Sequence, residues 1–410
     1  MIVIKYLWYY TFWTIVRFGL RIYFSKVKVT GLEKIPRNTP VIFGSNHENA
    51  FIDALLITTS NTLFDHYLVR AGVFKNAFAK AFLNSLNLMP VYRPEDGVNP
   101  LEANKQIFRA CFETLAKKYS VMLFPEGEHN IRRHRRVLKK GISRIALGAV
   151  NFEGGTKELS IVPVGVNYAD HTGFRSAVHI VFGEPIVVKQ QEESAANVNK
   201  LTLEITEALS KVHVSLDRNE FEGLDAVLFH DQNPYQIIEP VRVNQTAKKL
   251  GQRIDEVRQI GLEKKELEQA GVIFPYREST GWDQCKMWLL APLGLFGLLA
   301  HVPVLLPVNW FVSNKVKDIE FVASLKFGFS LFGIAIWWWF LANRILTQTE
   351  QWPIVLLSLL VLVLGLIGMN SFVRKWRNFR MTRFLRANPI LGTKYQAFVA
   401  DVDKLRASLD

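Results

Sequence analysis

The stretch SNHENAFID at 45–53 places a histidine and an aspartate inside an otherwise apolar region. A neutral imidazole at His47 is suited to take the proton from an alcohol whose oxygen attacks a carbonyl, and a carboxylate at Asp53 is suited to hold the other ring nitrogen. Six residues correspond to about 240° around an α-helix, so the two side chains cannot share one helical face. The pattern therefore predicts that His47 precedes a helix and that Asp53 lies on its first turns. The alternative is a pair of ordinary polar residues at the boundary of an element.

Three later stretches supply further candidate residues at expected strand ends. FPEGEHN at 124–130 follows an apolar run, and a glutamate in such a loop is suited to accept a hydrogen bond from a substrate hydroxyl. LMPVYRPED at 88–96 includes Arg93, whose planar guanidinium suits bidentate contact with a phosphate. IVPVGVNY at 161–168 ends a third strand. Each stretch taken alone is also typical of an ordinary turn or a solvated arginine.

In their order along the chain, 45–53, 88–96, 124–130 and 161–168, the four stretches resemble the motifs of the glycerolipid acyltransferase superfamily, the glycerophosphate and lysophosphatidate acyltransferases, over about residues 40–190. The resemblance implies that His47 is the general base of an acyl transfer and that Asp53 orients it. It further implies which residues line the substrates: Arg93, Glu126 and Gly127 at the acyl acceptor, and Pro163 on the side of the acyl chain.

Two departures from the usual motifs bear on the branch of the superfamily. The superfamily usually places four residues between the histidine and the aspartate, whereas five stand here, from Glu48 to Ile52. This spacing is similar to that of the larger fungal-type glycerol-3-phosphate and dihydroxyacetone-phosphate acyltransferases. The FPEG motif usually continues with Thr-Arg, whereas here it continues with Glu128 and His129. A phosphate-binding arginine is thus missing there, and three residues are candidates to replace it: Arg132, Arg133 and Lys140.

The C-terminal sequence from 301 to 331 also resembles the region that follows the catalytic domain in those larger enzymes. The expected reaction is therefore transfer of a fatty acyl group from acyl-CoA or acyl-carrier protein to a hydroxyl of glycerol 3-phosphate or dihydroxyacetone phosphate, in phospholipid synthesis. Acylation of lysophosphatidate at its second hydroxyl is the alternative within this class. A non-catalytic membrane lipid-binding module is the alternative of another class.

No cofactor, metal or covalent acyl-enzyme is expected in this reaction. The two cysteines, Cys111 and Cys285, lie outside the motifs and form no CxxC pattern, so neither is a candidate nucleophile and no disulfide framework is indicated. His47, His129 and His134 lack a spacing that would close a metal site. A metallohydrolase would also use histidine and carboxylates, and a chelator would distinguish it.

The candidate residues lie in a region, about 40–215, where short apolar runs alternate with helical patterns. This alternation predicts an α/β domain with a mixed sheet covered by helices, and a site in the crevice beyond the strand ends. The expected strands are 41–46, 66–72, 120–127, 159–168 and 178–186, and the expected helices are 53–60, 76–87, 99–119 and 139–152.

Three apolar runs follow residue 285, at 287–312, 321–342 and 353–373. The last two are long enough to cross about 30 Å of hydrocarbon, so we expect a C-terminal transmembrane helical hairpin. The first run contains three prolines, which break a straight helix, and it is expected to be re-entrant or interfacial. At the other end of the chain, aromatic residues are dense in 6–24, which predicts a retained interfacial helix, with a short span as the alternative.

The formal net charge of +13 is concentrated in two segments. Segment 131–144 holds seven lysines or arginines and no acid, and segment 374–386 holds six and no acid. Both adjoin apolar sequence, which favours an anionic membrane surface over nucleic acid as the partner. The alternative for 374–386 is a simple topology anchor. The positive-inside bias places this segment and the catalytic domain on the cytoplasmic face, so the number of crossings should be even and loop 343–352 should lie on the opposite side.

These expectations combine into one description of the chain. Its expected partners are membrane lipids and an acyl thioester donor, either acyl-CoA or acyl-carrier protein. Nucleic acid is not an expected partner. The expected parts are a membrane-contacting N-terminal helix at 1–30, an α/β acyltransferase domain at 31–215, a helical appendage at 216–285, a membrane region at 286–375 and a basic cytoplasmic tail at 376–410.

Overall fold

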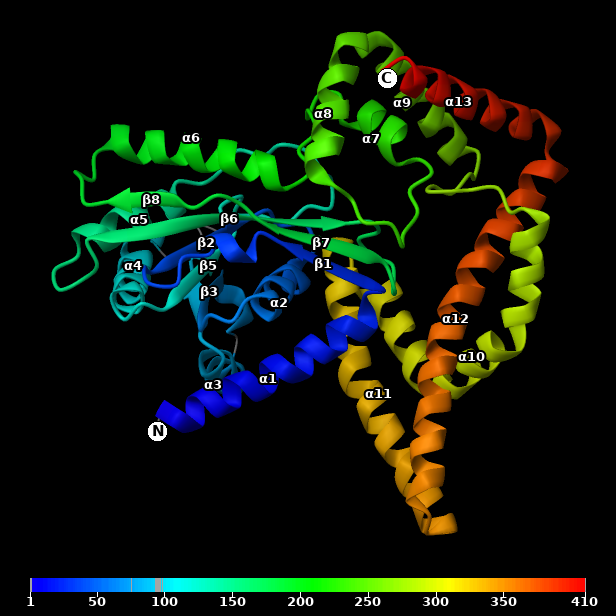
Figure 1. Ribbon diagram of the computed structural model, residues 1–410, viewed down its shortest axis with the longest axis horizontal. Helices are drawn as coiled ribbons and strands as arrows, with labels where there is room; N and C mark the ends of the chain where they lie inside the picture. The colour runs from blue at the N-terminus through cyan, green and yellow to red at the C-terminus, as the bar shows by residue number, and fades with distance from the viewer. Residues whose placement is uncertain (1, 75, 93–96, 98, 410) are drawn as a thin grey trace. The chain divides into compact units, whose positions relative to one another are not determined.

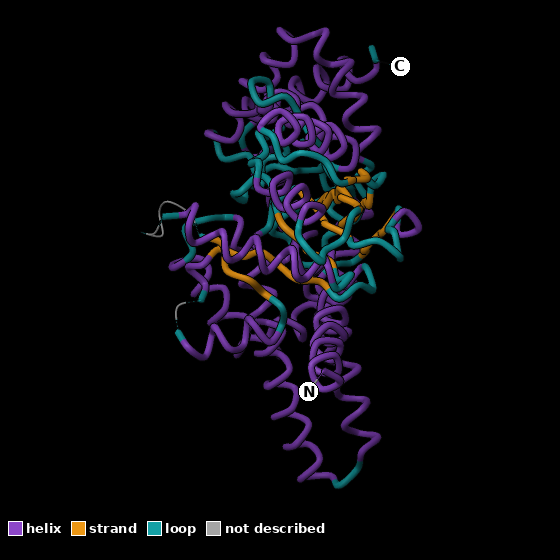
Figure 2. Tube along the Cα trace, turned by 90° about the vertical axis from the view of Figure 1, so that its left-hand side faces the viewer, coloured by secondary structure: helices purple, strands orange, loops and turns teal. Residues whose placement is uncertain are grey.

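A computed structural model describes residues 2–74, 76–92, 97 and 99–409, which form two compact units (Figure 1). The first unit runs to Ser215, without Thr172–Arg175, and also includes Ile237–Asn244. The second comprises Thr172–Arg175, Leu216–Gln236 and Gln245–Asp410. Every described strand lies in the first unit, and the second is built from helices and loops (Figure 2).

The first unit is an α/β domain around a mixed sheet. The sheet order is β1-β7-β6-β2-β5-β3-β4, with β8 also paired to β6. Most neighbours are parallel, and only β7 and β8 run antiparallel to β6. The strands are β1 Lys26–Thr30, β2 Val41–Ser45, β3 Asp65–Arg70, β4 Leu88–Val91, β5 Ser120–Leu123, β6 Glu158–Tyr168, β7 Ala177–Phe182 and β8 Ile186–Lys189.

Helices cover both faces of this sheet, as expected for largely parallel strands that are buried on two sides. One face packs in a single apolar core with α4 (Pro100–Ala116), α5 (Gly141–Asn151) and α6 (Ala195–Val212). The other face contacts α2 (Ala50–Ser60), which packs in turn against α1 (Ile2–Tyr23). The short helix α3 (Ala77–Ser85) adjoins β4. The predicted α/β class and mixed sheet are confirmed.

Helix α1 has one side fixed to the domain and another covered with exposed apolar residues. Tyr9, Val16 and Leu20 are buried, and the Trp13 indole donates to the Thr58 carbonyl at 2.9 Å. Exposed apolar side chains cover the remaining surface, among them Val3, Ile4, Leu7, Ile15 and Phe18. This distribution suits a helix lying on a membrane surface, and the interfacial position of α1 stays a prediction.

The second unit consists of the helices α7 Phe221–Phe229, α9 Ile254–Gln269, α10 Gly281–Lys315, α11 Glu320–Thr349, α12 Trp352–Ala387 and α13 Pro389–Ala407. Helix α8 (Pro240–Leu250) begins in the first unit and ends in the second. Three of these helices, α10, α11 and α12, are long and apolar enough to cross a membrane. The segment at 376–410, expected as a basic tail, is helical and packs through Phe398, Val402 and Leu405.

The prolines of the first apolar run bend the helix without ending it. Helix α10 continues through Pro292, Pro303 and Pro307, and Figure 1 shows that it curves strongly along its length. A proline removes one backbone hydrogen bond and displaces the preceding turn, so a bend at each is expected. The run is thus one bent helix over Gly281–Lys315, and its re-entrant or interfacial course stays a prediction.

Two further differences from the expected elements have local causes. The expected strand 178–186 is divided into β7 and β8, because Gly183 donates to the Pro163 carbonyl at 2.8 Å and Pro185 has no N–H for the ladder. Strand β1 differs from the expectation of an N-terminal helix over 1–30, because the helix ends at Tyr23 and Lys26–Thr30 is extended. Its alternating Lys and Val suit an edge strand paired only with β7.

Candidate active site

The candidate residues meet where three neighbouring strands end. Strand β2 lies between β5 and β6 and is parallel to both, so the carboxyl ends of the three strands share one edge of the sheet (Figure 1). His47 follows β2, Glu126 follows β5, and Tyr168 is the last residue of β6. Ligand sites of such sheets form at this edge.

His47 and Asp53 form a hydrogen-bonded pair. The Nδ1 atom of His47 lies 2.9 Å from Oδ2 of Asp53, and α2 begins at Ala50, so the aspartate stands on the first turn of the helix as predicted. Ala50 has φ +34°, an uncommon value for a residue with a side chain, in the turn that brings Asp53 back to His47. A carboxylate at Nδ1 favours the tautomer in which that nitrogen carries the proton, which leaves Nε2 as the basic atom.

Asp53 is fully buried and is held by four donors. Besides His47, the backbone N–H groups of Glu48 and Asn49 each donate to Oδ2 at 2.8 Å, and the Tyr168 hydroxyl donates to Oδ1 at 2.5 Å. Hydrogen bonds of this kind to a buried carboxylate fix its orientation and satisfy its charge. The Asp53 side chain is therefore fixed before any substrate binds.

Glu126 and Arg136 tie the FPEG loop to the residue that carries the imidazole. The Glu126 carboxylate accepts from the His47 backbone N–H at 3.1 Å and pairs with Arg136 at 2.6 Å. Arg136 also donates to the backbone carbonyls of His47, Glu128 and Asn130. Burial raises the pKa of Glu126 to about 8, against the opposing effect of the Arg136 guanidinium. The glutamate is thus occupied with protein groups, and its expected contact with an acceptor hydroxyl stays a prediction.

A second polar layer holds the segment around His47. The Glu48 carboxylate lies 2.7 Å from the His171 ring, and the Asn49 amide donates to the His171 carbonyl at 2.8 Å. The Asn46 side chain forms hydrogen bonds with both backbone groups of Val166 of β6, donating to its carbonyl at 3.0 Å and accepting from its N–H at 2.8 Å. Segment 46–49 is thereby joined to β6 and the residues that follow it.

The turn after β5 places an aromatic ring on His47. The Phe124 ring stacks on the imidazole, with centroids 3.8 Å apart and planes 9° apart. The turn closes through Gly127, whose N–H donates to the Phe124 carbonyl at 3.0 Å and whose φ is +78°. Glycine adopts this left-handed conformation without strain, which explains the residue type at this position.

The candidate replacements for the missing arginine lie in different surroundings. Arg133 donates to the Tyr168 carbonyl at 2.9 Å, at the end of β6 and beside the site. Arg132 is exposed, and Lys140 precedes α5, where it lines a small separate cavity with Arg144. Arg93, the other expected phosphate ligand, lies outside the described residues. The structure therefore brings Arg133 close to the site and does not bring Lys140 there.

Pro163 lies within the sheet, opposite Gly44 of β2. It is buried, and its carbonyl accepts the hydrogen bond from Gly183. The position is close to the carboxyl end of β2, and its relation to an acyl chain stays a prediction.

Among the described residues, no group of three or more His, Cys, Asp or Glu side chains is arranged to hold a metal ion.

Sequence analysis missed several residues of this site: Arg136, Tyr168, His171, Glu48 and Asn46. Arg136 belongs to the basic segment 131–144, but six other lysines or arginines precede or follow it there, and nothing in the sequence distinguishes it. Tyr168 closes the VPV stretch, and its position at a strand end was the available signal. Glu48 and Asn46 flank His47 directly, and polar neighbours of a candidate base could have been included on that ground.

Comparison with known proteins identifies the class. Residues 26–167 match the family model described as Acyltransferase, a range that contains His47, Asp53 and Glu126. The chain therefore carries an acyltransferase domain, and the resemblance on which the sequence analysis relied is confirmed. Two curated relatives are named as glycerol-3-phosphate O-acyltransferases.

Both relatives are from Saccharomyces cerevisiae. Glycerol-3-phosphate O-acyltransferase 2 is 27% identical over 198 residues, which cover 45% of this chain and 25% of the relative. Glycerol-3-phosphate O-acyltransferase 1 is 33% identical over 85 residues, covering 21% of this chain and 11% of the relative. The matches thus span a quarter of the first relative's length and less of the second.

A solved structure, that of the 1-acyl-sn-glycerophosphate (LPA) acyltransferase PlsC from Thermotoga maritima, also matches, at 20% identity and a TM-score of 0.36. The match covers 47% of this chain and 76% of that chain.

Proposed function

We propose that this protein transfers a fatty acyl group from a thioester to a hydroxyl of glycerol 3-phosphate or dihydroxyacetone phosphate at a membrane. The observation that carries the proposal is the His47–Asp53 pair at the edge where β6, β2 and β5 end. The matched yeast relatives are named as glycerol-3-phosphate acyltransferases, which supports this acceptor. The five-residue spacing between His47 and Asp53 favours the same branch.

His47 acts as the general base in this mechanism. Its Nε2 atom takes the proton from the acceptor hydroxyl while the hydroxyl oxygen bonds to the thioester carbon, and Asp53 stabilises the imidazolium that forms. The tetrahedral intermediate then expels the thiolate, which takes the proton from the imidazolium. The transfer is direct, with neither cysteine as the nucleophile: Cys111 is a residue of α4 buried in the apolar core, and Cys285 lies outside the motifs.

Positive charge beside the site supports a phosphate-bearing acceptor. Arg133 donates to the Tyr168 carbonyl, and Arg136 lies against Glu126, so two guanidinium groups stand within the residues that surround His47.

Acyl-CoA and acyl-carrier protein both carry the required thioester, and both are proposed donors. No further cofactor is proposed. Lysophosphatidate is the alternative acceptor, and the assay below includes it.

The test is the His47→Ala variant of the full-length protein in detergent. We expect acyl transfer to fall by about 10²-fold or more, because the base is lost, while the thermal unfolding temperature is retained. The assay supplies labelled glycerol 3-phosphate, dihydroxyacetone phosphate or lysophosphatidate, each with acyl-CoA and with acyl-carrier protein. The matched control is His134→Ala, which removes an imidazole from the neighbouring loop and should keep full activity.

The assay separates the competing functions. Full activity of His47→Ala would refute the mechanism. Acylation of lysophosphatidate alone by the unmodified protein would replace the proposed acceptor, and lipid binding without any transfer would support the non-catalytic module. Loss of activity with a chelator would favour the metallohydrolase alternative.

A further inference from the structure

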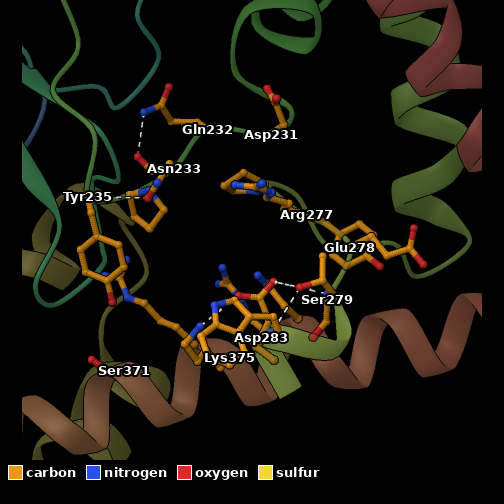
Figure 3. A pocket seen from close by; sticks show the side chains of 18 of the residues that line it. Asp231, Gln232, Asn233, Tyr235, Arg277, Glu278, Ser279, Asp283, Ser371 and Lys375 are labelled. Carbon is orange, nitrogen blue, oxygen red and sulfur yellow. Dashed lines mark hydrogen bonds and ion pairs between the residues drawn. The ribbon is translucent and has the colours of Figure 1, made fainter. Parts of the chain in front are cut away.

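The second unit contains a cavity that the acyl transfer does not use. Its volume is about 530 Å³, and it lies between the loop 231–235, the segment 275–283 and helix α12 (Figure 3). None of its lining residues belongs to the cluster around His47, and all of them lie in the second unit. The cavity therefore needs its own interpretation.

The lining residues lie where two apolar helices become polar. On α12, the apolar run 353–373 ends at the cavity, which is lined beyond it by Arg374, Lys375 and Arg377. On α10, the cavity is lined by Trp282 and Asp283, just before the apolar part of that helix. If these helices cross a bilayer, the cavity lies at the level of the lipid headgroups.

Aromatic residues mark the same level. Trp282 and Trp288 of α10 and Trp376 of α12 are exposed, and the Trp288 and Trp376 rings are 6.4 Å apart. Exposed tryptophans gather at the membrane interface, because the indole combines an apolar ring with a polar N–H. Of the three, Trp282 lines the cavity itself, which favours lipid over bulk water at its opening.

The acidic residues of the cavity wall are already paired. Asp231 lies 3.1 Å from Arg406, and Glu278 lies 3.0 Å from Arg386, two arginines that do not line the cavity. The carboxylate of the third acidic residue, Asp283, pairs with Lys375 of the wall at 3.2 Å and accepts from the backbone N–H of Thr280, the N-cap of α10, at 3.3 Å.

The arginines of the wall keep an excess of positive charge. Among the described residues, neither Arg277 nor Arg377 has a carboxylate within 4.0 Å, and both side chains are exposed at the cavity. Arg277 reaches into the space between the 231–235 loop and α12 in Figure 3. Arg374 lies over the Tyr235 ring at 4.9 Å, which holds its guanidinium in the wall. An anion with several acceptor oxygens matches this arrangement.

We propose that this cavity binds the phosphate headgroup of an anionic membrane glycerolipid. Arg277 and Arg377 contact the phosphate oxygens, and the acyl chains lie along the apolar surfaces of α10 and α12. A soluble phosphate ester shares the phosphate but lacks the chains, and the position of the cavity at the end of two apolar helices favours the lipid. The site is independent of the proposed acyl transfer.

The test measures binding of dioctanoyl phosphatidylglycerol to the full-length protein in neutral detergent, by native mass spectrometry. The variant Arg277→Gln/Arg377→Gln should raise the dissociation constant by about tenfold or more, because two charged hydrogen-bond donors are lost. The matched control, Arg380→Gln/Lys394→Gln, removes the same charge from exposed residues of this unit that do not line the cavity, and should leave binding within about twofold.

Further arms identify the source of the phosphate. Dioctanoyl phosphatidylcholine should bind more weakly than phosphatidylglycerol, and inorganic phosphate or glycerol 3-phosphate should not displace the lipid at equal concentration. Equal losses in the two double variants would overturn the proposal, because binding would then follow overall charge. Displacement by the soluble phosphates would assign the cavity to a soluble ester and also overturn it. Thermal unfolding of each variant checks that the unit remains folded.

Discussion

At the scale of single residues, the site is defined by how tightly Asp53 is held. Four donors converge on its carboxylate from the turn before α2 and from the end of β6. A shorter or longer side chain at this position could not reach all four at once. Three of these donors are local, and the fourth, Tyr168, is 115 residues away in the sequence, so the full set forms only in the folded domain.

Arg136 should matter for stability as well as for activity. Arg136→Ala removes the ion-pair partner of buried Glu126 and three donors to backbone carbonyls, so we expect the free energy of unfolding to fall by about 3 kcal/mol and transfer to slow. Thermal or denaturant unfolding and the transfer assay measure the two effects. Arg136→Lys keeps the positive charge but lacks the planar guanidinium group, so it should restore only part of the lost stability and only part of the lost transfer rate.

A double variant separates the ion pair from the carbonyl contacts. Arg136→Ala/Glu126→Gln leaves no buried carboxyl without its partner, so it should be less destabilised than the sum of the two single variants. Simple additivity would mean that the Glu126–Arg136 pair contributes no coupling.

Part of this site could be predicted from the sequence. The order of the motifs identified His47, Asp53 and Glu126, and the spacing placed the aspartate on the first helical turn. The contacts of Arg136 with His47 and of Tyr168 with Asp53 could not be predicted, because they join segments 89 and 115 residues apart and depend on which strands become neighbours. Nothing in the sequence distinguishes Arg136 from the other six arginines and lysines of segment 131–144.

At the scale of elements, α10 and α12 are held together by glycines. A Cβ atom built on Gly297 would lie 1.9 Å from the Gly365 carbonyl oxygen, and one built on Gly368 would lie 2.7 Å from Leu293. Small residues allow two helix backbones to approach closely, which is a common device where lipid rather than water surrounds the helices.

Gly297→Ala should therefore destabilise the second unit. The added methyl group collides with backbone, so the helices must separate, and we expect a loss of about 1–3 kcal/mol, seen as a lower unfolding temperature in detergent. Gly328→Ala in α11 is the matched control, because a Cβ there meets nothing within 4 Å. It should be neutral or slightly stabilising, since alanine favours helix. Equal effects of the two substitutions would contradict this packing.

The connection among α1, α2 and the sheet includes a buried carboxyl group whose ionisation should make stability depend on pH. Asp65 begins β3 and contacts Asn61 and Ser120, and burial raises its pKa to about 7. The folded state then holds a proton that the unfolded state releases near its ordinary value of 3.8. The stabilising contribution is therefore complete below about pH 4 and is lost as the pH rises to about 7.

Asp65→Asn should remove this dependence. The amide cannot ionise, so the variant should not lose stability as the carboxyl group does. The unfolding temperature of the variant minus that of the unmodified protein should therefore be larger at pH 7.5 than at pH 4.5. Glu33→Gln, at an exposed carboxylate, is the control and should leave the difference unchanged. A parallel pH dependence in both Asp65→Asn and the unmodified protein would contradict the assignment.

Elements with strong periodicity were predictable, and short or interrupted ones were not. The helices at α4 and α5 and the strands β2 and β6 follow from apolar spacing. Strand β1 is five residues long with two lysines, and its identity depends on β7 being available as a neighbour. For α10, the sequence correctly indicated that the prolines disturb the helix, but tertiary contact with α12 keeps it continuous.

At the scale of the whole molecule, the chain joins an acyltransferase domain to a helical unit with three helices able to span a membrane. Helices α11 and α12 are connected by only Glu350 and Gln351, so they form the expected hairpin. We propose that the hairpin crosses the membrane and that the acyltransferase domain lies on the cytoplasmic face, as the basic segment 374–386 favours.

Cysteine labelling tests this topology. The background variant Cys285→Ser removes the exposed thiol and leaves buried Cys111. In it, a cysteine at Glu350 should react with a membrane-impermeant maleimide added to intact cells, whereas a cysteine at Lys189 should react only after permeabilisation. Labelling of both positions under the same condition would place the connection and the domain on one side, and would contradict the even number of crossings.

The ring of Phe124 on His47 has a consequence for the whole reaction. A thioester is open to attack by water as well as by an alcohol, and an activated base would assist either nucleophile. With Asp53 at one nitrogen and Phe124 over one face, His47 presents little more than its Nε2 edge, and its side chain is only 16% exposed. An acceptor bound at that edge excludes water from Nε2. The Phe124 ring should therefore limit the fraction of the acyl donor that is hydrolysed instead of transferred.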